Sequence, residues 1–285
     1  MTSRRHLAFD GEVAIVTGAG NGLGRAHALE LASRGARVVV NDTGGDVEGN
    51  GLGSSVAQAV VDQIAAAGGE AVADHHSVAD PAGAQAIVQA ALDTFGQLDI
   101  VVNNAGILRD GSFAKLTPDR VDPVFDVHLR GAFHVTRPAW EIMRGRKYGR
   151  IINTSSGSGL FGNYGQANYA AAKMGLIGLT RVLAIEGERL GIRVNAIAPI
   201  ARSRMTEPVM GEAAADFPPE YVSPLVAYLA HRECAVSGHF YSVGGGKLSR
   251  VFIAQTAGVD KPGFTAEDVA EQIAEIDAVA TFVVR

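Results

Sequence analysis

The chain has 285 residues, of which 47% are hydrophobic and 19% charged, with a formal net charge of −5 and one cysteine. No apolar run approaches the roughly 20 residues that span a bilayer, so we expect a soluble protein without membrane insertion. Because the charges are dispersed and their sum is negative, the sequence argues against nucleic-acid binding and favours small-molecule partners. A single cysteine cannot form an internal disulfide, which fits a reducing compartment such as the cytoplasm.

Short β-branched runs alternate along the chain with segments that carry apolar residues at helical spacing. Strands separated by helices of roughly ten or more residues need crossover connections, so they lie parallel and the helices cover both faces of the sheet. The sequence thus predicts an α/β fold, a Rossmann-like doubly wound parallel sheet of seven strands. The strands are expected at residues 13–17, 37–41, 71–73, 98–102, 151–153, 193–198 and 240–243, and the main helices at residues 24–33, 54–67, 81–95, 118–143 and 167–190.

We expect one domain with a short C-terminal helical extension. Neither an internal repeat nor a linker rich in proline, serine and glycine divides residues 7–247, which should form the core. Three glycines at residues 244–246 are expected to form a turn after the last strand. In the extension, residues 248–285, the segment 266–279 has the pattern of an amphipathic helix.

A glycine-rich segment, Thr17-Gly-Ala-Gly-Asn-Gly-Leu-Gly24, follows the first predicted strand. It departs from the general G-x-G-x-x-G pattern, because Leu23 and Arg25 stand where the last glycine would fall in the two registers. Glycines let the backbone turn sharply and approach a pyrophosphate, which the exposed amides and the start of the next helix would bind. The alternative is a structural turn without a ligand.

Asp42 ends the second predicted strand, 18 residues after Gly24. This is close to the spacing of about 20 residues at which an acid binds the ribose hydroxyls of adenosine. A carboxylate there would repel a 2′-phosphate, and neither Asn21 nor Thr43 supplies a cation to neutralise it. The pattern therefore favours NAD over NADP, with a solvated loop aspartate as the alternative.

Later in the chain, a set of three residues forms a candidate centre for acid–base chemistry. Tyr169 and Lys173 are four residues apart, so in a helix they project from the same face. A tyrosine titrates near about pH 10, and a nearby ammonium or a positive nicotinamide ring would favour the phenolate. Ser156 follows the fifth strand and can hold a substrate oxygen. Taken separately, these residues could be a core aromatic, a solvated helix-face lysine and a helix cap.

Together with Asn103-Asn-Ala-Gly106, these motifs resemble those of the short-chain dehydrogenase/reductase family. Longer segments are similar to the dehydrogenase units of peroxisomal multifunctional enzymes of type 2, and this similarity extends over nearly the whole chain. They include residues 41–46, 127–131, 161–169, 203–206 and 219–225.

The resemblance implies NAD-dependent oxidation of a (3R)-3-hydroxyacyl-CoA to the 3-oxoacyl-CoA in fatty-acid metabolism. Oxidation of 17β-hydroxysteroids, hence steroid metabolism, is the alternative, and a catalytically idle NAD-binding regulator is a third possibility of a different class. In this family the two long helices, residues 118–143 and 167–190, form a four-helix interface, so a homodimer is expected.

The resemblance also implies which residues form the site. The catalytic residues would be Ser156, Tyr169 and Lys173. The resemblance adds His128, which stands where most members of the family carry a catalytic asparagine. The cofactor would contact Gly18, Asn21, Gly22, Leu23, Gly24, Asp42, Ser77, Val78, Asn104, Ala105, Gly106, Tyr169, Lys173 and Pro199.

Other positions carry weaker expectations. His76 stands where many members have an aspartate near the adenine, and Pro199 is followed by Ile-Ala instead of the usual glycine. No metal site is expected, since the adjacent His75 and His76 would diverge on a strand. Three arginines follow the fourth and sixth strands and could meet CoA phosphates, although surface charge or an ion pair would explain them equally well: Arg109, Arg202 and Arg204.

Overall fold

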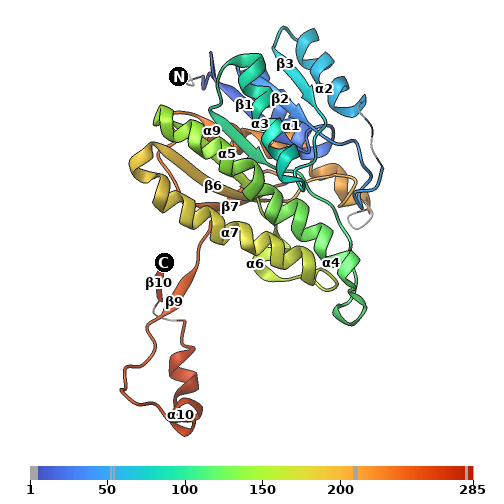
Figure 1. Ribbon diagram of the computed structural model, residues 1–285. Coiled ribbons are helices and arrows are strands. Elements are labelled where there is room, and N and C mark those ends of the chain that lie inside the picture. Colours follow the sequence, from blue (N-terminus) through green and yellow to red (C-terminus); the bar gives the residue numbers. More distant parts are fainter. Residues whose placement is uncertain (1–5, 52, 54, 208–210, 280–281, 285) are drawn as a thin grey trace. The chain divides into compact units, whose positions relative to one another are not determined.

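An eight-stranded sheet forms the centre of the computed structural model, which describes residues 6–51, 53, 55–207, 211–279 and 282–284 (Figure 1). Its strand order is β3-β2-β1-β4-β5-β6-β7-β8, and each neighbouring pair from β3 to β7 is parallel. The predicted doubly wound α/β fold is confirmed. The strands are β1 Val13–Thr17, β2 Arg37–Asn41, β3 Ala71–Asp74, β4 Ile100–Asn103, β5 Gly149–Thr154, β6 Ile192–Pro199, β7 Phe240–Gly244 and β8 Lys247–Val251.

The prediction of seven strands was wrong by one. Strand β8 follows β7 after only two residues, a connection too short for a parallel crossover, so it must run antiparallel to β7. All of its residues are exposed except Val251, which is half-buried. An exposed strand lacks the apolar run by which buried strands are detected in a sequence.

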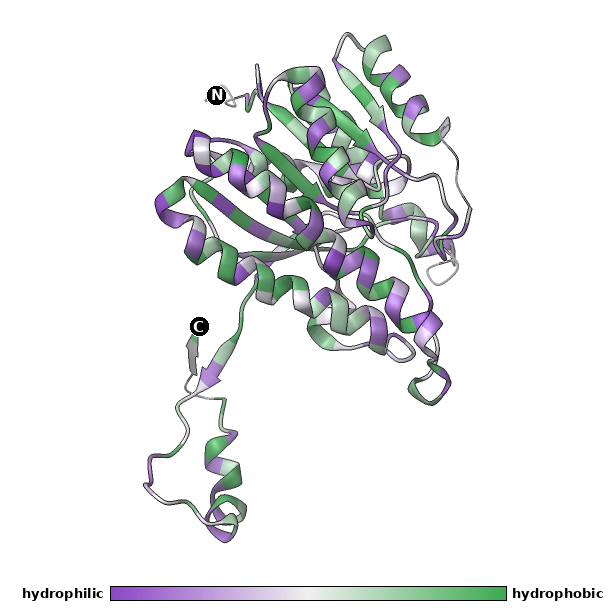
Figure 2. Ribbon diagram, viewed as in Figure 1, coloured by the Kyte–Doolittle hydropathy of each residue, from purple (hydrophilic) through white to green (hydrophobic). Residues whose placement is uncertain are grey.

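The inner strands of the sheet are buried on both faces, and Figure 2 shows them as largely hydrophobic. Side chains of β1 alternate between two cores, Ala14 and Val16 on one face and Val13 and Ile15 on the other. The first face is covered by α1 Gly22–Ser33, α2 Ser55–Ala66 and α9 Ser223–Ala230. The second is covered by α3 Pro81–Phe95, α5 Gly131–Arg146 and α7 Ala167–Gly187. Residue 54, the predicted start of the second helix, lies outside the described residues.

The helix predicted over residues 118–143 is interrupted. Helix α4, Pro118–Phe125, continues into a π-helical turn, Asp126–Arg130, before α5 begins. Such turns insert a residue into a helix and redirect the side chains that follow. Gly131, the first residue of α5, lets this helix pass close to the loop that follows β3. A Cβ atom on this glycine would lie only 2.8 Å from Val78 Cγ2.

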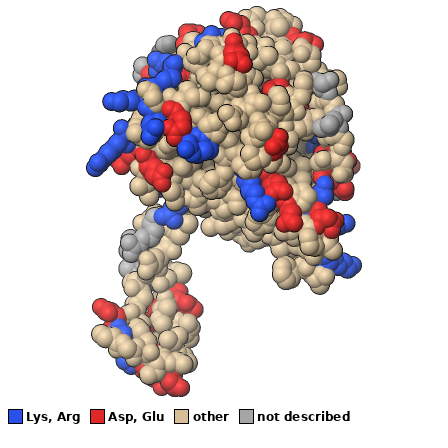
Figure 3. Space-filling model, viewed as in Figure 1, with Lys and Arg blue, Asp and Glu red and all other residues tan. Residues whose placement is uncertain are grey.

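Shorter elements complete the fold. Helix α6, Gly157–Phe161, follows β5, and short 3-10 turns occur at Phe113–Lys115, Glu188–Leu190, Gly211–Asp216 and Pro219–Tyr221. No helix among the described residues is both long and apolar enough to span a membrane. On the face drawn in Figure 3, basic and acidic side chains are interspersed over the sheet-bearing part of the chain.

The chain divides into two compact units, Met1–Ser249 and Arg250–Arg285. In the second unit, β9 Ala254–Thr256 pairs antiparallel with β10 Phe282–Val284. Its helix α10, Ala266–Ile276, begins at a capping box between Thr265 and Asp268 and ends three residues before the predicted end. The cap explains the helix start, because it satisfies backbone amides that have no partner within the helix.

A buried histidine joins α1 to α9. His27 Nδ1 lies 2.8 Å from Ser223 Oγ, while its Nε2 has no hydrogen-bond partner among the described residues. Burial lowers the pKa of His27 from 6.5 to about 3. Below pH 6.5 the unfolded chain therefore takes up a proton at this residue that the folded protein does not bind.

Stability should consequently decline as the pH falls from 6.5 towards 3. For His27 alone the loss of unfolding free energy between pH 7.5 and pH 5 should be about 2 kcal/mol. We expect His27→Gln, which retains polar partners for Ser223 but does not titrate, to lose about that much less than the wild type. Urea unfolding at both pH values measures this, and equal losses in the two proteins would show that His27 does not set the pH dependence.

Candidate active site

A cleft of about 530 Å³ opens at the carboxyl ends of the parallel strands. The strand order reverses between β1 and β4 at this edge, which is where doubly wound sheets bind ligands. Most residues of the predicted site line this cleft: Gly18, Asn21, Gly22, Leu23, Gly24, Asp42, Ser77, Val78, Asn104, Ala105, Gly106, His128, Ser156, Tyr169, Lys173, Pro199 and Arg204.

The glycine turn after β1 has the geometry that a pyrophosphate requires. Gly18 and Gly22 have φ angles of +63° and +51°, and a Cβ on Gly24 would lie only 2.1 Å from the carbonyl oxygen of Gly18. Helix α1 begins at Gly22, so its first amides lie at the cleft. The Asn104 side chain donates to the carbonyls of Thr17 and Gly18, at 3.0 and 3.1 Å. These residues fit a dinucleotide phosphate.

The carboxylate of Asp42 is fixed at the edge of the same turn. One oxygen accepts a hydrogen bond from the Gly20 amide and the other from the Gly44 amide, both at 2.8 Å. A Cβ on Gly20 would lie 2.9 Å from the nearer oxygen, so this approach depends on glycine. Asp42 is therefore an ordered part of the cleft wall and not a solvated loop residue.

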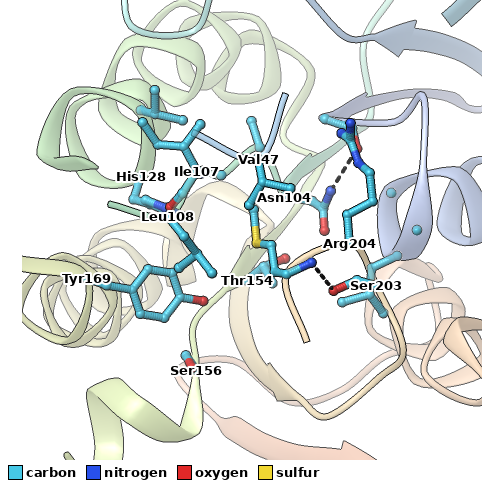
Figure 4. A pocket seen from close by; sticks show the side chains of 18 of the residues that line it. Val47, Asn104, Ile107, Leu108, His128, Thr154, Ser156, Tyr169, Ser203 and Arg204 are labelled. Atoms are coloured by element: carbon cyan, nitrogen blue, oxygen red, sulfur yellow. Dashed lines mark hydrogen bonds between the residues drawn. The ribbon is translucent and has the colours of Figure 1, made fainter. Parts of the chain in front are cut away.

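The same cleft is also lined by Tyr169, Lys173 and Ser156. Figure 4 shows the Tyr169 ring beside Ser156. Tyr169 and Lys173 are one turn apart on α7, with Nζ of the lysine 5.6 Å from the centre of the tyrosine ring. The lysine donates to the carbonyl oxygen of Thr154, at the end of β5, over 2.5 Å. Ser156 caps the start of α6, where its Oγ accepts a hydrogen bond from the Ser158 amide at 3.2 Å, and its hydroxyl lies near the phenol of Tyr169.

Burial controls the protonation of this cluster. It raises the pKa of Tyr169, an effect opposed by the nearby Ser156 side chain and reinforced by the charge of Asp110. Burial also lowers the pKa of Lys173 to about 7. The sequence led us to expect that the lysine would favour the phenolate. In the protein alone, burial instead raises the pKa of the phenol, so Tyr169 is neutral at pH 7.

His128 lies beneath this cluster, in the π-helical turn. Its ring meets the Tyr169 ring edge-on, with 5.0 Å between centres, and its Nε2 lies 2.8 Å from the carbonyl oxygen of Ile107. A Cβ on Gly106 would approach the ring to 2.3 Å, so the chain after β4 packs directly on the histidine. Burial, followed by the charge of Lys173, holds the pKa of His128 well below 6.5. A neutral imidazole thus supports both Tyr169 and the β4 loop.

The three candidate arginines occupy different surroundings. Arg204 lines the cleft and donates to the carbonyl oxygen of Gly45 over 3.3 Å. Arg109 is outside the cleft lining and joins the loop after β2 to the start of α4, through the carbonyls of Glu48 and Asp119. Arg202 also lies outside the lining. The geometry therefore keeps Arg204 as the arginine at the cleft and gives Arg109 a bridging position.

Several residues of the cleft wall were not predicted from the sequence. Thr154 holds the lysine through its carbonyl, and its own hydroxyl is buried without a partner among the described residues. Val47 belongs to the loop after β2, and its carbonyl oxygen accepts a 2.9 Å hydrogen bond from the Leu108 amide in the loop after β4. The position of Thr154 at a strand end was a usable signal, whereas the loop crossing joins distant segments and has none.

Comparison with known proteins agrees with this geometry. The family model for short chain dehydrogenases matches residues 12–212. Peroxisomal multifunctional enzyme type 2 of Mus musculus is 53% identical over 253 residues, 88% of this chain but 34% of the mouse protein. Hydroxyacyl-CoA dehydrogenase ChsB1 of Mycobacterium tuberculosis is 42% identical over 260 residues, 85% of this chain and 80% of that protein. A solved short chain dehydrogenase from Mycobacterium avium has a TM-score of 0.84 at 49% identity, covering 94% of both chains. The chain thus spans about a third of the multifunctional enzyme that it matches.

Proposed function

The chain belongs to the short-chain dehydrogenase family and is an oxidoreductase, and from this premise we propose that it uses NAD to oxidise (3R)-3-hydroxyacyl-CoA esters to 3-oxoacyl-CoA esters. The observation that carries the proposal is the single cleft that joins the glycine turn to Tyr169, Ser156 and Lys173. The similarity to multifunctional enzyme type 2 and to a protein named as a hydroxyacyl-CoA dehydrogenase supports the substrate.

The residues present fit NAD from one end of the cleft to the other. The glycine turn and the start of α1 would hold the pyrophosphate, and Asp42 the ribose hydroxyls of adenosine. Lys173 would contact the nicotinamide ribose, and the segment after Pro199 the carboxamide. When bound, NAD supplies a hydride acceptor and a positive charge near the phenol.

The side chains of the cluster then divide the work of oxidising an alcohol. Ser156 holds the substrate oxygen beside Tyr169, since both side chains line the same part of the cleft. Tyr169 accepts the proton of the substrate hydroxyl while the hydrogen on the carbinol carbon leaves as hydride, so the alcohol loses two electrons and two hydrogens. Lys173 stabilises the phenolate, and His128 keeps the tyrosine ring in place by its edge-on contact. In the reverse direction the tyrosine returns the proton.

The substrate assignment is tested by assaying NADH formation with (3R)- and (3S)-3-hydroxyacyl-CoA esters of several chain lengths and with a 17β-hydroxysteroid. We expect turnover of the (3R) esters, and a loss of about 100-fold or more in kcat for Tyr169→Phe, which removes the proton-transfer atom but keeps the ring. NAD binding by that variant, measured by calorimetry, should be nearly unchanged. Turnover of the steroid alone would transfer the assignment to the alternative substrate class, and near-normal kcat in Tyr169→Phe would remove the tyrosine from the chemistry.

Cofactor choice is expected to depend on Asp42. Its carboxylate is held by two amides and would face a 2′-phosphate at close range, so catalytic efficiency with NAD should exceed that with NADP. Asp42→Ala should reduce this preference, on the order of 10-fold or more. Asp62→Ala, on the exposed side of α2, changes the net charge equally and should leave the preference unchanged. Equal efficiency with both cofactors in the wild type would place Asp42 outside the ribose site.

We also propose that the protein is a homodimer. One face of α7 exposes a row of apolar side chains, Met174, Val182 and Ile185, and Phe133 is exposed on α5. Few charged side chains lie over the middle of α7 on the face drawn in Figure 3. Apolar rows of this kind usually pack against another helix.

Light scattering at micromolar concentration should give the mass of a dimer. A charge introduced by Val182→Glu should favour the monomer, because burying it in the interface would be unfavourable. A monomer mass for the wild type would refute the proposal.

A further inference from the structure

The loop after β2 contains a compact unit, residues 43–51, which we call the strap. Its base is closed where the Gly53 amide donates to the carbonyl oxygen of Thr43 over 2.9 Å. Near its tip, Asp46 Oδ1 accepts the backbone amide of Asn50 at 2.8 Å, and the Asp46 amide donates to the Asn50 carbonyl at 2.9 Å. These bonds lie within the loop, so the strap keeps its own shape.

The strap crosses the end of β1. In the sheet, β1 lies between β2 and β4, and the strap is bound to the loop that follows β4. The Leu108 amide donates to the carbonyl oxygen of Val47 over 2.9 Å, and a Cβ on Gly49 would lie 3.0 Å from Ile107 Cγ2. A chain that runs from the end of β2 to the loop after β4 must pass the end of β1, where the glycine turn begins. The strap and the glycine turn line the same cleft.

Arg109 connects the strap to the helices beside the cleft. Its Nε donates to the carbonyl oxygen of Glu48 over 3.0 Å, and its Nη1 donates to that of Asp119, on α4, over 2.7 Å. The backbone of Arg109 is itself held by the buried Asn168 on α7, whose side-chain amide donates to the Arg109 carbonyl over 3.0 Å. The guanidinium therefore ties the strap to a part of the fold that is fixed next to Tyr169.

A bound dinucleotide would lie beneath the strap. In the proposed arrangement NAD extends from Asp42, past the glycine turn, to Tyr169, and the strap with its contact to Leu108 spans the middle of that path. Arg204, from the loop after β6, contacts the strap as well, donating to the carbonyl oxygen of Gly45 over 3.3 Å. Because it is held from both loops, the strap would have to move away before a dinucleotide could enter or leave.

We propose that the strap closes over the bound cofactor and that Arg109 is the positioning residue that holds it closed. Opening of the strap then limits both the entry and the release of the dinucleotide. The inference rests on the proposed use of NAD. It assigns Arg109, which lies outside the cleft lining, to cofactor exchange and not to contact with substrate phosphates.

The first test measures the rates at which NADH binds and dissociates, by stopped-flow fluorescence, with excess NAD to displace bound NADH. Arg109→Met keeps most of the length of the side chain but removes its donors, so we expect both rates to rise about 3- to 10-fold. Because both rates change in the same direction, the dissociation constant should change less than either.

Arg120→Met is the matched control for this test. Arg120 is an exposed neighbour that donates to the carbonyl oxygen of Asp110, and none of its hydrogen bonds in the described part of the chain reaches the strap. The substitution removes the same charge, and both rates should stay at the wild-type values.

The second test fixes the strap in its closed position. A Cβ on Gly49 would lie 3.7 Å from Ile107 Cβ, within the range of about 3.5 to 4.5 Å that a disulfide spans. In Gly49→Cys/Ile107→Cys, thiol titration shows whether the pair has joined, since the one native cysteine, Cys234, is buried. We expect oxidation to slow NADH binding and release on the order of 10-fold or more, and dithiothreitol to restore both rates. The reduced form of the same sample is the control for the substitutions themselves.

The outcomes separate the strap from the role of Arg109. Slower exchange after oxidation with unchanged rates in Arg109→Met would keep the strap but remove Arg109 as the residue that holds it. A rise in the dissociation rate alone in Arg109→Met would mean that this arginine contacts the dinucleotide directly, which would overturn its positioning role. Rates unchanged in both tests would overturn the inference while NADH binding stands. If the wild type does not bind NADH, the proposed NAD dependence fails, and the inference fails with it.

Discussion

The burial of Lys173 is the constraint on which the rest of the site depends. Its ammonium group is removed from water and donates to the carbonyl oxygen of Thr154, at the end of β5. Withdrawing a charge from water is unfavourable, which is why the pKa of this lysine falls to about 7. The same low-polarity surroundings raise the pKa of Tyr169. The protein alone therefore holds a neutral phenol beside a lysine near its titration midpoint, and the charge that would favour a phenolate enters with the cofactor.

This arrangement needs the backbone to approach closely at several points. Helix α6 packs on the helix that carries the lysine, where a Cβ on Gly159 would lie 2.9 Å from Lys173 Cβ. Gly106 makes room for His128, and the π-helical turn brings that histidine under Tyr169. The parallel sheet contributes by ending its strands at one edge, so that residues far apart in the chain reach the same cleft.

Local patterns were sufficient to predict the parts of the molecule that depend on neighbouring residues. The glycine turn, the four-residue spacing of Tyr169 and Lys173, and the alternation of strands with helices all express such short-range geometry. The π-helical turn, the exposed strand β8 and the bridging contacts of Arg109 depend on tertiary packing, which leaves no periodic signal. His76 is intermediate: its departure from the family pattern was visible, but its bond to Asp74 required the folded turn.

The most direct test of the account is the ionisation of Tyr169, followed by ultraviolet absorbance as the difference between the wild type and Tyr169→Phe. Without cofactor, the extra tyrosinate signal of the wild type should appear only above pH 10, because burial raises the pKa of this phenol. Saturating NAD should move the signal to lower pH, since its positive charge lies near the phenol. Ionisation of Tyr169 near neutral pH in the cofactor-free protein would contradict the account, because Lys173 alone would then be sufficient to generate the base.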